Sequence, residues 1–201
     1  MKIVALGAHP DDIEYGCGGT LLQAAKHGHD IYLNVMTDGL GPVDRRKEQE
    51  ASARYLGARE VLWGGFKDTE LTASRALIVA IEKTLNQVNP DVVFVNYPED
   101  AHQDHQNLAS STITACRYIR QVFFYHDYTT LNFQPDTFVD IGPVLDRKKE
   151  LIACHASQVK KTNPTGLDML ESVNALAAYY GFMAKVKYAE AFKPLRNLIT
   201  L

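Results

Sequence analysis

The sequence predicts an α/β fold, namely a Rossmann-like, mostly parallel sheet flanked by helices. Short apolar runs alternate along the chain with longer segments whose apolar residues recur at helical spacing. This alternation is typical of strand-helix-strand units, which place their strands side by side in a parallel sheet. A length of 201 residues with 46% hydrophobic residues fits one domain that covers residues 1–201.

The first two thirds of the chain alternate strand and helix in strict order. The run DVVFVN at residues 91–96 is rich in β-branched side chains and gives the clearest strand. Gly28, Gly57 and the Asn89-Pro90 pair favour the termination of the helices that precede them. The predicted strands cover residues 2–8, 30–36, 60–63 and 91–96, and the predicted helices cover residues 18–27, 45–56, 72–88 and 105–117.

The last third of the chain has a less regular pattern. Residues 121–125 and 137–141 are predicted strands, and residues 188–192 form a short extended segment. Helical spacing predicts helices over residues 144–155 and 167–182. The segment KKTNPT at residues 160–165 combines residues that favour turns, so we expect a mobile loop there.

Charge and apolar content exclude several classes of protein. With 21 Lys+Arg against 24 Asp+Glu the net charge is −3, so we expect no nucleic-acid partner. The first apolar run is shorter than the roughly 7–15 residues of a signal-peptide core, and no window approaches the roughly 18–20 residues that span a bilayer. We therefore expect a cytoplasmic protein without membrane insertion. Cys17, Cys116 and Cys154 are widely separated, which predicts free thiols.

Polar side chains are concentrated just after the predicted strands, where ligands bind in open parallel sheets. His9, Asp11 and Asp12 follow the first strand, and the loop at residues 97–105 carries further histidines and acids. Catalytic zinc takes three protein ligands of this kind and leaves one position open for water. The sequence therefore predicts a divalent metal site at this edge of the sheet, although the spacing alone does not decide which of Asp11 and Asp12 binds the metal.

Other site chemistries find little support. The glycine cluster at residues 16–19 lacks the spacing of a dinucleotide-binding loop and the lysine of a nucleotide-binding P-loop. We interpret these glycines as small residues that let a helix approach the sheet closely. The chain has neither a G-x-S-x-G nor an H-E-x-x-H motif, so the usual serine-hydrolase and zincin signals are missing.

Two motifs resemble those of the LmbE/PIG-L family of zinc-dependent N-deacetylases. They are A-H-P-D-D at residues 8–12, followed by G-C-G-G-T, and H-Q-D-H at residues 102–105. Supporting similarities extend over nearly the whole chain: T-D-G at residues 37–39, Arg46 and Glu48 ahead of Leu56-Gly57, H-x-S-Q at residues 155–158, and Y-A-E-A-F at residues 188–192.

The resemblance implies an activity and a set of catalytic residues. His9, Asp12 and His105 would bind one Zn²⁺ per chain, with Fe²⁺ or another divalent metal as the alternative. Asp11 would act as general base on a metal-activated water that hydrolyses an N-acetyl amide. Protonated His102, oriented by Asp104, would stabilise the oxyanion or protonate the leaving amine. The expected partner is a small N-acetylated amino sugar or its glycoside.

Four further residues have two interpretations each. Arg46 resembles a family position near the sugar, but it also suits a surface ion pair. Asp38 would bind sugar hydroxyls or cap the next segment. Trp63 would line a sugar pocket or pack as a strand residue. His155 would support the site from behind, or it would stand in the last turn of a helix because the helix dipole favours it there.

Three other functions compete with the deacetylase. Phosphoester hydrolysis usually requires two metals, whereas three evident ligands suit one. A non-catalytic metal-binding module of the same fold would bind metal without turnover, although the ligands, the base and the His-Asp pair are all present. Hydrolysis of another amide or ester is the third alternative. The oligomeric state is left open, and a homo-oligomer is compatible with the sequence.

Overall fold

A computed structural model describes residues 1–39, 43–159, 161 and 166–198 of the chain. The strands are β1 (Lys2–Gly7), β2 (Asp30–Thr37), β3 (Glu60–Phe66), β4 (Val92–Asn96), β5 (Gln121–Tyr125), β6 (Thr137–Asp140) and β7 (Ala189–Arg196). The helices are α1 (Asp12–Lys26), α2 (Arg45–Leu56), α3 (Arg75–Val88), α4 (Gln103–Ala115), α5 (Leu145–Ala153), α6 (Ala156–Val159) and α7 (Met169–Ala184), with a 3₁₀ turn at Gly142–Val144.

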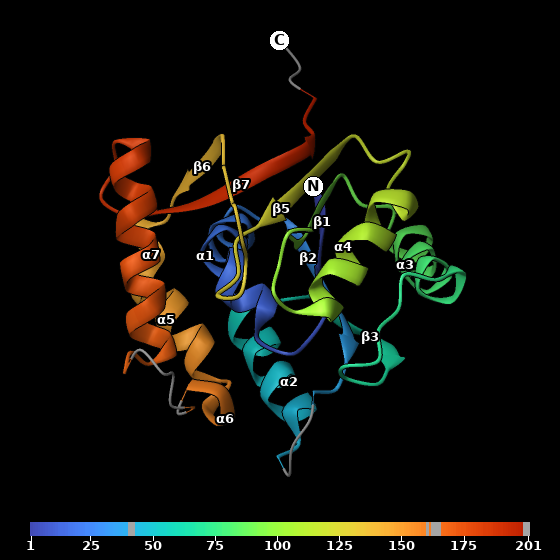
Figure 1. Ribbon diagram of the computed structural model, residues 1–201. Coiled ribbons are helices and arrows are strands. Elements are labelled where there is room, and N and C mark those ends of the chain that lie inside the picture. Colours follow the sequence, from blue (N-terminus) through green and yellow to red (C-terminus); the bar gives the residue numbers. More distant parts are fainter. Residues whose placement is uncertain (40–42, 160, 162–165, 199–201) are drawn as a thin grey trace.

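The strands form one sheet in the order β3-β2-β1-β4-β5-β7-β6 (Figure 1). The first five of these strands pair in parallel, whereas β7 runs antiparallel to both of its neighbours. The predicted α/β class with a mostly parallel sheet is confirmed. From β1 the chain continues to β2 on one side of the sheet, and from β4 it continues to β5 on the other side. The loops that follow the neighbouring strands β1 and β4 therefore meet at a topological switch point.

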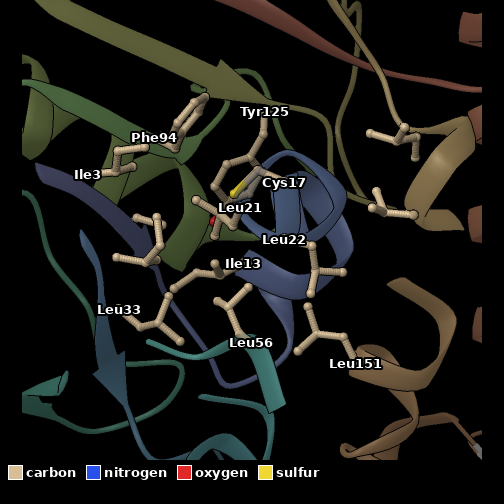
Figure 2. Close-up of a cluster of buried hydrophobic side chains, with 14 of the residues drawn as sticks. Ile3, Ile13, Cys17, Leu21, Leu22, Leu33, Leu56, Phe94, Tyr125 and Leu151 are labelled. Carbon is tan, nitrogen blue, oxygen red and sulfur yellow. The ribbon is translucent and has the colours of Figure 1, made fainter. Parts of the chain in front are cut away.

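Apolar side chains cover both faces of the sheet. On one face, α1 contributes Ile13, Leu21 and Leu22, which pack on β1, β2 and β4 together with residues of α2 and α5 (Figure 2). On the other face, Leu77 and Ile81 of α3 and residues of α4 pack on the same strands. Helices thus shield the central strands on both sides, which explains why these strands are almost continuously apolar.

Helix α1 begins at Asp12, six residues before the predicted start at residue 18. The glycines made this stretch look like a loop, but they lie inside the helix where it contacts the sheet. An added Cβ at Gly16 would lie 2.1 Å from Cδ2 of Tyr125, which is fully buried. The expectation that small residues permit close helix-sheet approach is therefore correct, while the predicted start of the helix is wrong.

The other boundary differences have local causes. Ser74 accepts a hydrogen bond from Leu77 N and starts α3 three residues later than predicted. Gly65, with φ of 75°, lets β3 continue to Phe66 past a register shift. The predicted helix at residues 144–155 ends at Ala153 and is followed by the separate α6, so His155 lies between the two helices. The predicted mobile loop at residues 160–165 falls outside the described residues except for Lys161.

A buried ion pair ties the last strand to the first helix. Glu190 of β7 accepts hydrogen bonds from the backbone N–H groups of Gly19 and Thr20 in α1, each at 2.7 Å. Lys148 of α5 donates to Glu190 Oε1 and to Tyr15 O, both at 2.6 Å. Each buried charge is therefore paired and hydrogen-bonded, as the cost of its desolvation requires.

Within the described ranges, no helix is both long enough and apolar enough to cross a membrane. The three cysteines are free, as predicted. Cys17 and Cys116 are buried, as expected for free thiols, whereas Cys154 is partly exposed.

The contact between α1 and Tyr125 leads to a stability prediction. We expect Gly16→Ala to lower the free energy of unfolding by about 3 kcal/mol, because the new methyl group must displace a buried ring. Gly18→Ala is the matched control, since its Cβ would meet a Leu151 methyl group at 3.0 Å that can rotate away. Urea unfolding measures both variants, and equal losses would contradict the packing argument.

Candidate metal centre and active site

The turn between β1 and α1 places two carboxylates at the start of a helix. Asp11 has φ of 101°, a strained backbone conformation for a residue other than glycine. The turn is held by Asp12 Oδ2, which accepts a hydrogen bond from His9 N at 2.9 Å, and by Thr37 N, which donates to Ala8 O at 3.0 Å. Both carboxylates lie in the favourable field of the α1 N-terminus.

The loop after β4 places a second group of polar side chains against the first. Asp100 Oδ1 accepts a hydrogen bond from His102 N at 2.8 Å, and His102 caps the N-terminus of α4. His105 in the first turn of α4 is 1% exposed and contacts His9 from β1. The adjacent positions of β1 and β4 in the sheet therefore bring together residues almost a hundred positions apart.

The three expected metal ligands converge on one point. His9 Nδ1 lies 3.2 Å from His105 Nε2 and 3.7 Å from Asp12 Oδ2, and the latter two atoms lie 3.4 Å apart. Ligand atoms bound tetrahedrally at about 2.0–2.2 Å from zinc are separated by about 3.3–3.6 Å. In addition, Asp12 Oδ1 is buried without a hydrogen-bond partner. The residues present therefore fit a divalent metal.

The neighbouring charges support the same interpretation. Burial alone would lower the pKa of His9, but contacts with Asp104, Asp12 and Asp68 raise it to about 12. The pKa of His105 is raised to about 11 by Asp12 and Asp100 despite the opposing effect of burial. The surrounding carboxylates thus favour positive charge on both imidazoles. A metal ion that binds there takes the place of their protons.

Several polar residues behind the ligands did not stand out in the sequence. Asp100 Oδ2 lies 3.3 Å from His105 Nδ1, the ring nitrogen that faces away from His9, and so fixes that ring. Asn96 donates to Asp12 and to Asp127 at 3.3 Å each. Asp68 Oδ1 lies 3.1 Å from His9 Nε2. Asp100 and Asn96 border predicted strand ends, which was the available signal. Nothing local in the sequence pointed to Asp68 or Asp127.

The structure changes the expected relation between Asp104 and His102. The Asp104 carboxylate lies 3.2 Å from His9 Nε2 and accepts a hydrogen bond from Thr69 N at 2.7 Å, so it orients His9 and not His102. Only the backbone N–H of Asp104 contacts His102, donating to its Nδ1 at 3.2 Å. Burial and the charges of His9 and His105 lower the pKa of His102. Its neutral ring, with Nδ1 occupied as an acceptor, carries its proton on Nε2.

Asp11 is buried next to an arginine that sequence reasoning did not select. Arg45, at the start of α2, donates from Nη2 to Asp11 Oδ1 at 2.8 Å and also to Pro10 O. Burial raises the pKa of Asp11 to about 6, and Arg45 counteracts part of that rise. The second carboxylate oxygen, Oδ2, is buried without a hydrogen-bond partner. This combination leaves one carboxylate oxygen of Asp11 available as a base, in the residue next to Asp12.

The two expected substrate-binding residues lie at the surface and contact each other. Arg46 donates to Asp38 at 2.8 Å, and their side chains are 43% and 51% exposed. The Arg46 guanidinium also lies over the Trp63 ring, 4.6 Å from its centroid. Asp38 and Arg46 are thus accessible, whereas Trp63 is partly buried and packs against the core. The arginine that contacts Asp11 is the neighbouring residue, Arg45.

His155 is fully buried behind α1 and does not stand in the last turn of a helix. Its Nε2 lies 3.4 Å from Oε2 of Glu14, which is also buried. The other carboxylate oxygen of Glu14, Oε1, accepts a hydrogen bond from Gln49 at 2.6 Å. Contact with Glu14 raises the pKa of His155 although burial opposes the rise. Glu48 accepts hydrogen bonds from Ser157 N and Oγ at 2.8 and 2.6 Å. These contacts connect α1 and α2 to the chain around α6.

The fold and this cluster together define the class of LmbE-like α/β proteins. Within that class the chain belongs to the PIG-L family, whose model, described as GlcNAc-PI de-N-acetylase, matches residues 4–116. It is 34% identical over 170 residues to the uncharacterized deacetylase YaiS of Escherichia coli, covering 79% of this chain and 89% of that protein. It is 26% identical to the diacetylchitobiose deacetylase of Thermococcus kodakarensis over 96% of this chain and 82% of that protein.

Solved structures share the fold as well. The N,N'-diacetylchitobiose deacetylase of Pyrococcus horikoshii, bound to its inhibitor, superposes with a TM-score of 0.86 at 27% identity over 96% of this chain and 83% of the other. The 4-carboxy-2-hydroxymuconate hydratase GalB of Pseudomonas putida has the same fold at 21% identity, with a TM-score of 0.82 and coverage of 100% and 98%. The fold therefore does not fix the reaction, which must be argued from the site.

The pairing of Arg45 with Asp11 predicts how stability depends on pH. We expect Arg45→Met to destabilise the metal-free protein by about 3–5 kcal/mol at pH 8, because it leaves a buried carboxylate unpaired. The exposed control, Arg46→Met, should cost less than about 1 kcal/mol.

The direction in which the stability of Arg45→Met changes with pH follows from the raised pKa of Asp11. A carboxyl group that holds its proton longer in the folded state reduces stability as pH rises through the gap between the unfolded and folded values. Loss of Arg45 raises the pKa of Asp11 in the folded protein above about 6. The loss of unfolding free energy in Arg45→Met, relative to the wild type, should therefore grow from pH 5 to pH 8. Thermal unfolding with a chelator present measures it, and a deficit independent of pH would refute the pairing.

Proposed function

We propose that this protein is a metal-dependent hydrolase that removes an N-acyl group, in particular N-acetyl, from an amino sugar or its glycoside. One observation carries the proposal: three ligand atoms lie 3.2 to 3.7 Å from one another, beside a buried carboxylate with one unpartnered oxygen. The names of related proteins support the substrate class, since they include deacetylases of diacetylchitobiose and of an N-acetylglucosaminyl malate.

In this proposal His9, Asp12 and His105 hold one divalent metal, with zinc as the first candidate and iron(II) as the second. The site contains nitrogen and carboxylate ligands without a thiolate, and zinc accepts both types. When bound, the metal supplies Lewis acidity, which makes water more acidic and a carbonyl carbon more electrophilic. Asp104 and Asp100 fix the two histidine rings from behind, through Nε2 of His9 and Nδ1 of His105.

Asp11 acts as the general base. Its second oxygen, Oδ2, is buried without a hydrogen-bond partner, and its raised pKa keeps it basic enough to accept a proton from the attacking water. The proton then passes from Asp11 to the nitrogen of the leaving amine. Arg45 holds the other oxygen, so the carboxylate has a single orientation for both transfers.

His102 acts as a neutral hydrogen-bond donor to the developing oxyanion. Its Nδ1 accepts a hydrogen bond from Asp104 N, which leaves the Nε2–H group available to the reacting carbonyl oxygen. The ring lies 4.6 Å from the His9 ring and 4.8 Å from the His105 ring, measured between centroids. This neutral donor replaces the protonated acid that the sequence suggested.

The decisive experiment separates metal binding from turnover. We expect about one equivalent of metal in the wild type and almost none in His105→Ala, measured by elemental mass spectrometry. Asp11→Asn should retain the metal but release amine from N,N'-diacetylchitobiose about 10²- to 10⁴-fold more slowly, because it lacks the base. Full activity of Asp11→Asn would overturn its role as base.

The remaining outcomes distinguish the competing functions. Metal binding without release of amine from any N-acetyl sugar would favour a non-catalytic module. Hydration of 4-carboxy-2-hydroxymuconate without amide hydrolysis would favour the hydratase reaction named for the structural relative. Release of phosphate from a sugar phosphate would favour phosphoester hydrolysis.

The surface pair of Asp38 and Arg46, with the partly buried Trp63 beneath Arg46, is the proposed contact for the sugar beyond the reacting acetamide. Arg46→Ala and Asp38→Ala should each raise KM for N,N'-diacetylchitobiose about 3- to 10-fold with little change in kcat, because each removes about one hydrogen bond. Their effects should not be additive, since the two side chains contact each other at 2.8 Å. Steady-state kinetics of both variants and the double variant tests this, and a fall in kcat alone would contradict it.

A further inference from the structure

Helix α7 is apolar on both of its faces. Val173, Ala177, Tyr180 and Gly181 are buried against the rest of the protein. On the opposite side, Tyr179 is 59% exposed and Phe182 is 76% exposed, a spacing of three residues that puts both on one face. A helix that is apolar all round is typical of a buried position, yet α7 lies at the edge of the molecule beside α5 and β6 (Figure 1).

The charges on α7 are confined to its two ends. Glu171 lies in the first turn, and Lys185 directly follows the last turn. Between them the helix carries neither an acidic nor a basic side chain. The Lys185 ammonium lies 5.0 Å from the centroid of the Phe182 ring, which projects from the surface beside it. The exposed face is thus an apolar strip with a negative and a positive end.

A hollow lies on the other half of the same helix. It has a volume of about 430 Å³. Its walls come from the first two turns of α7 and from α5: Lys149, Asp168, Leu170, Glu171, Asn174 and Ala175. Phe182 projects seven residues from Ala175, about 10 Å along the helix. The face therefore carries exposed aromatic rings toward one end and an open hollow toward the other.

We propose that two copies of the chain associate through antiparallel contact of their α7 helices about a two-fold axis near Ala178. In this arrangement residues at equal distances on either side of Ala178 face each other, so Phe182 of each copy lies opposite Asn174, which lines the hollow of the other copy. Lys185 of each copy approaches Glu171 of the other. The same two-fold operation places each Phe182 ring against the hollow of the other copy and each Lys185 near Glu171 of the other copy, as an isologous contact requires.

The second copy is preferred to an unrelated partner because the face complements itself in shape and charge. The two exposed rings contribute roughly 250–300 Å² if each has about 200 Å² of surface. A standard interface buries about 800 Å² on each side, so the walls of the hollow and the flanking turns must supply the rest. We therefore expect a dimer of micromolar affinity, independent of the proposed activity.

The test measures self-association of the full chain. Sedimentation velocity between about 1 and 100 µM should give a concentration-dependent dimer for the wild type. Phe182→Asp should weaken the dimer at least about tenfold, as expected for an aromatic residue at the centre of an interface. Tyr118→Asp is the matched control, because Tyr118 is 85% exposed and follows α4, away from α7.

A charge reversal tests the arrangement of the helices. Lys185→Glu should weaken the dimer because it brings two acidic groups together, whereas Lys187→Glu, at the next exposed lysine, should leave it unchanged. Circular dichroism verifies that each variant is folded. A wild type that stays monomeric over the whole range, or a dimer that Phe182→Asp does not weaken, would overturn the proposal.

Discussion

A concentration of buried negative charge between β1 and β4 is the constraint on which the rest of the site depends. Five acidic side chains are buried there, namely Asp11, Asp12, Asp100, Asp104 and Asp127. The basic side chains that face them are Arg45, His9 and His105. Desolvated carboxylates tolerate such crowding only when cations and hydrogen-bond donors surround them.

Helix α1 carries this cluster, and the surrounding elements hold the helix in place. Its N-terminus contains Asp11 and Asp12, its Gly16 contacts Tyr125 of β5, and Glu14 accepts a hydrogen bond from Gln49 of α2. Every one of these contacts is buried, so a small displacement of the helix would disturb packing and polar contacts together. Rigid placement of a reacting group to a fraction of an ångström is what catalysis by positioning requires.

Much of the fold could be predicted from the sequence because periodicity and stop signals agree. The helix over residues 45–56 and the strand over residues 121–125 have the predicted bounds. Helix α1 could not be predicted as well, since its glycines contact a ring more than a hundred residues away. Helix α7 was predicted at residues 167–182 and runs from Met169 to Ala184. The periodic pattern placed it, but did not reveal that one apolar face is exposed.

The residues of the candidate site could be predicted where they belong to a sequence motif. They were harder to predict where their position depends on contacts in the folded structure. The motifs brought His9, Asp12 and His105 together as candidate ligands, and their atoms do converge. Arg45 and Arg46 are adjacent at the start of α2, so their side chains point in directions one helical step apart. The sequence does not specify how the first turn of a helix is rotated, and hence which of the two side chains faces the interior. Asp104 turns to His9 because His102 uses its own ring to cap α4. Asp127 follows β5, and only the sheet order brings it near Asp12.

The contact between Glu190 and α1 has a consequence for the order in which the protein matures during synthesis. A ribosome produces every residue of the candidate metal centre by position 127, when the partners of α1 in α2 and β5 have also been made. The partner of α1 in β7 is made last: Glu190 then accepts the N–H groups of Gly19 and Thr20, and Lys148 becomes paired. A chain cleaved before β7 would keep every residue of the candidate site but lose one of the contacts that hold α1.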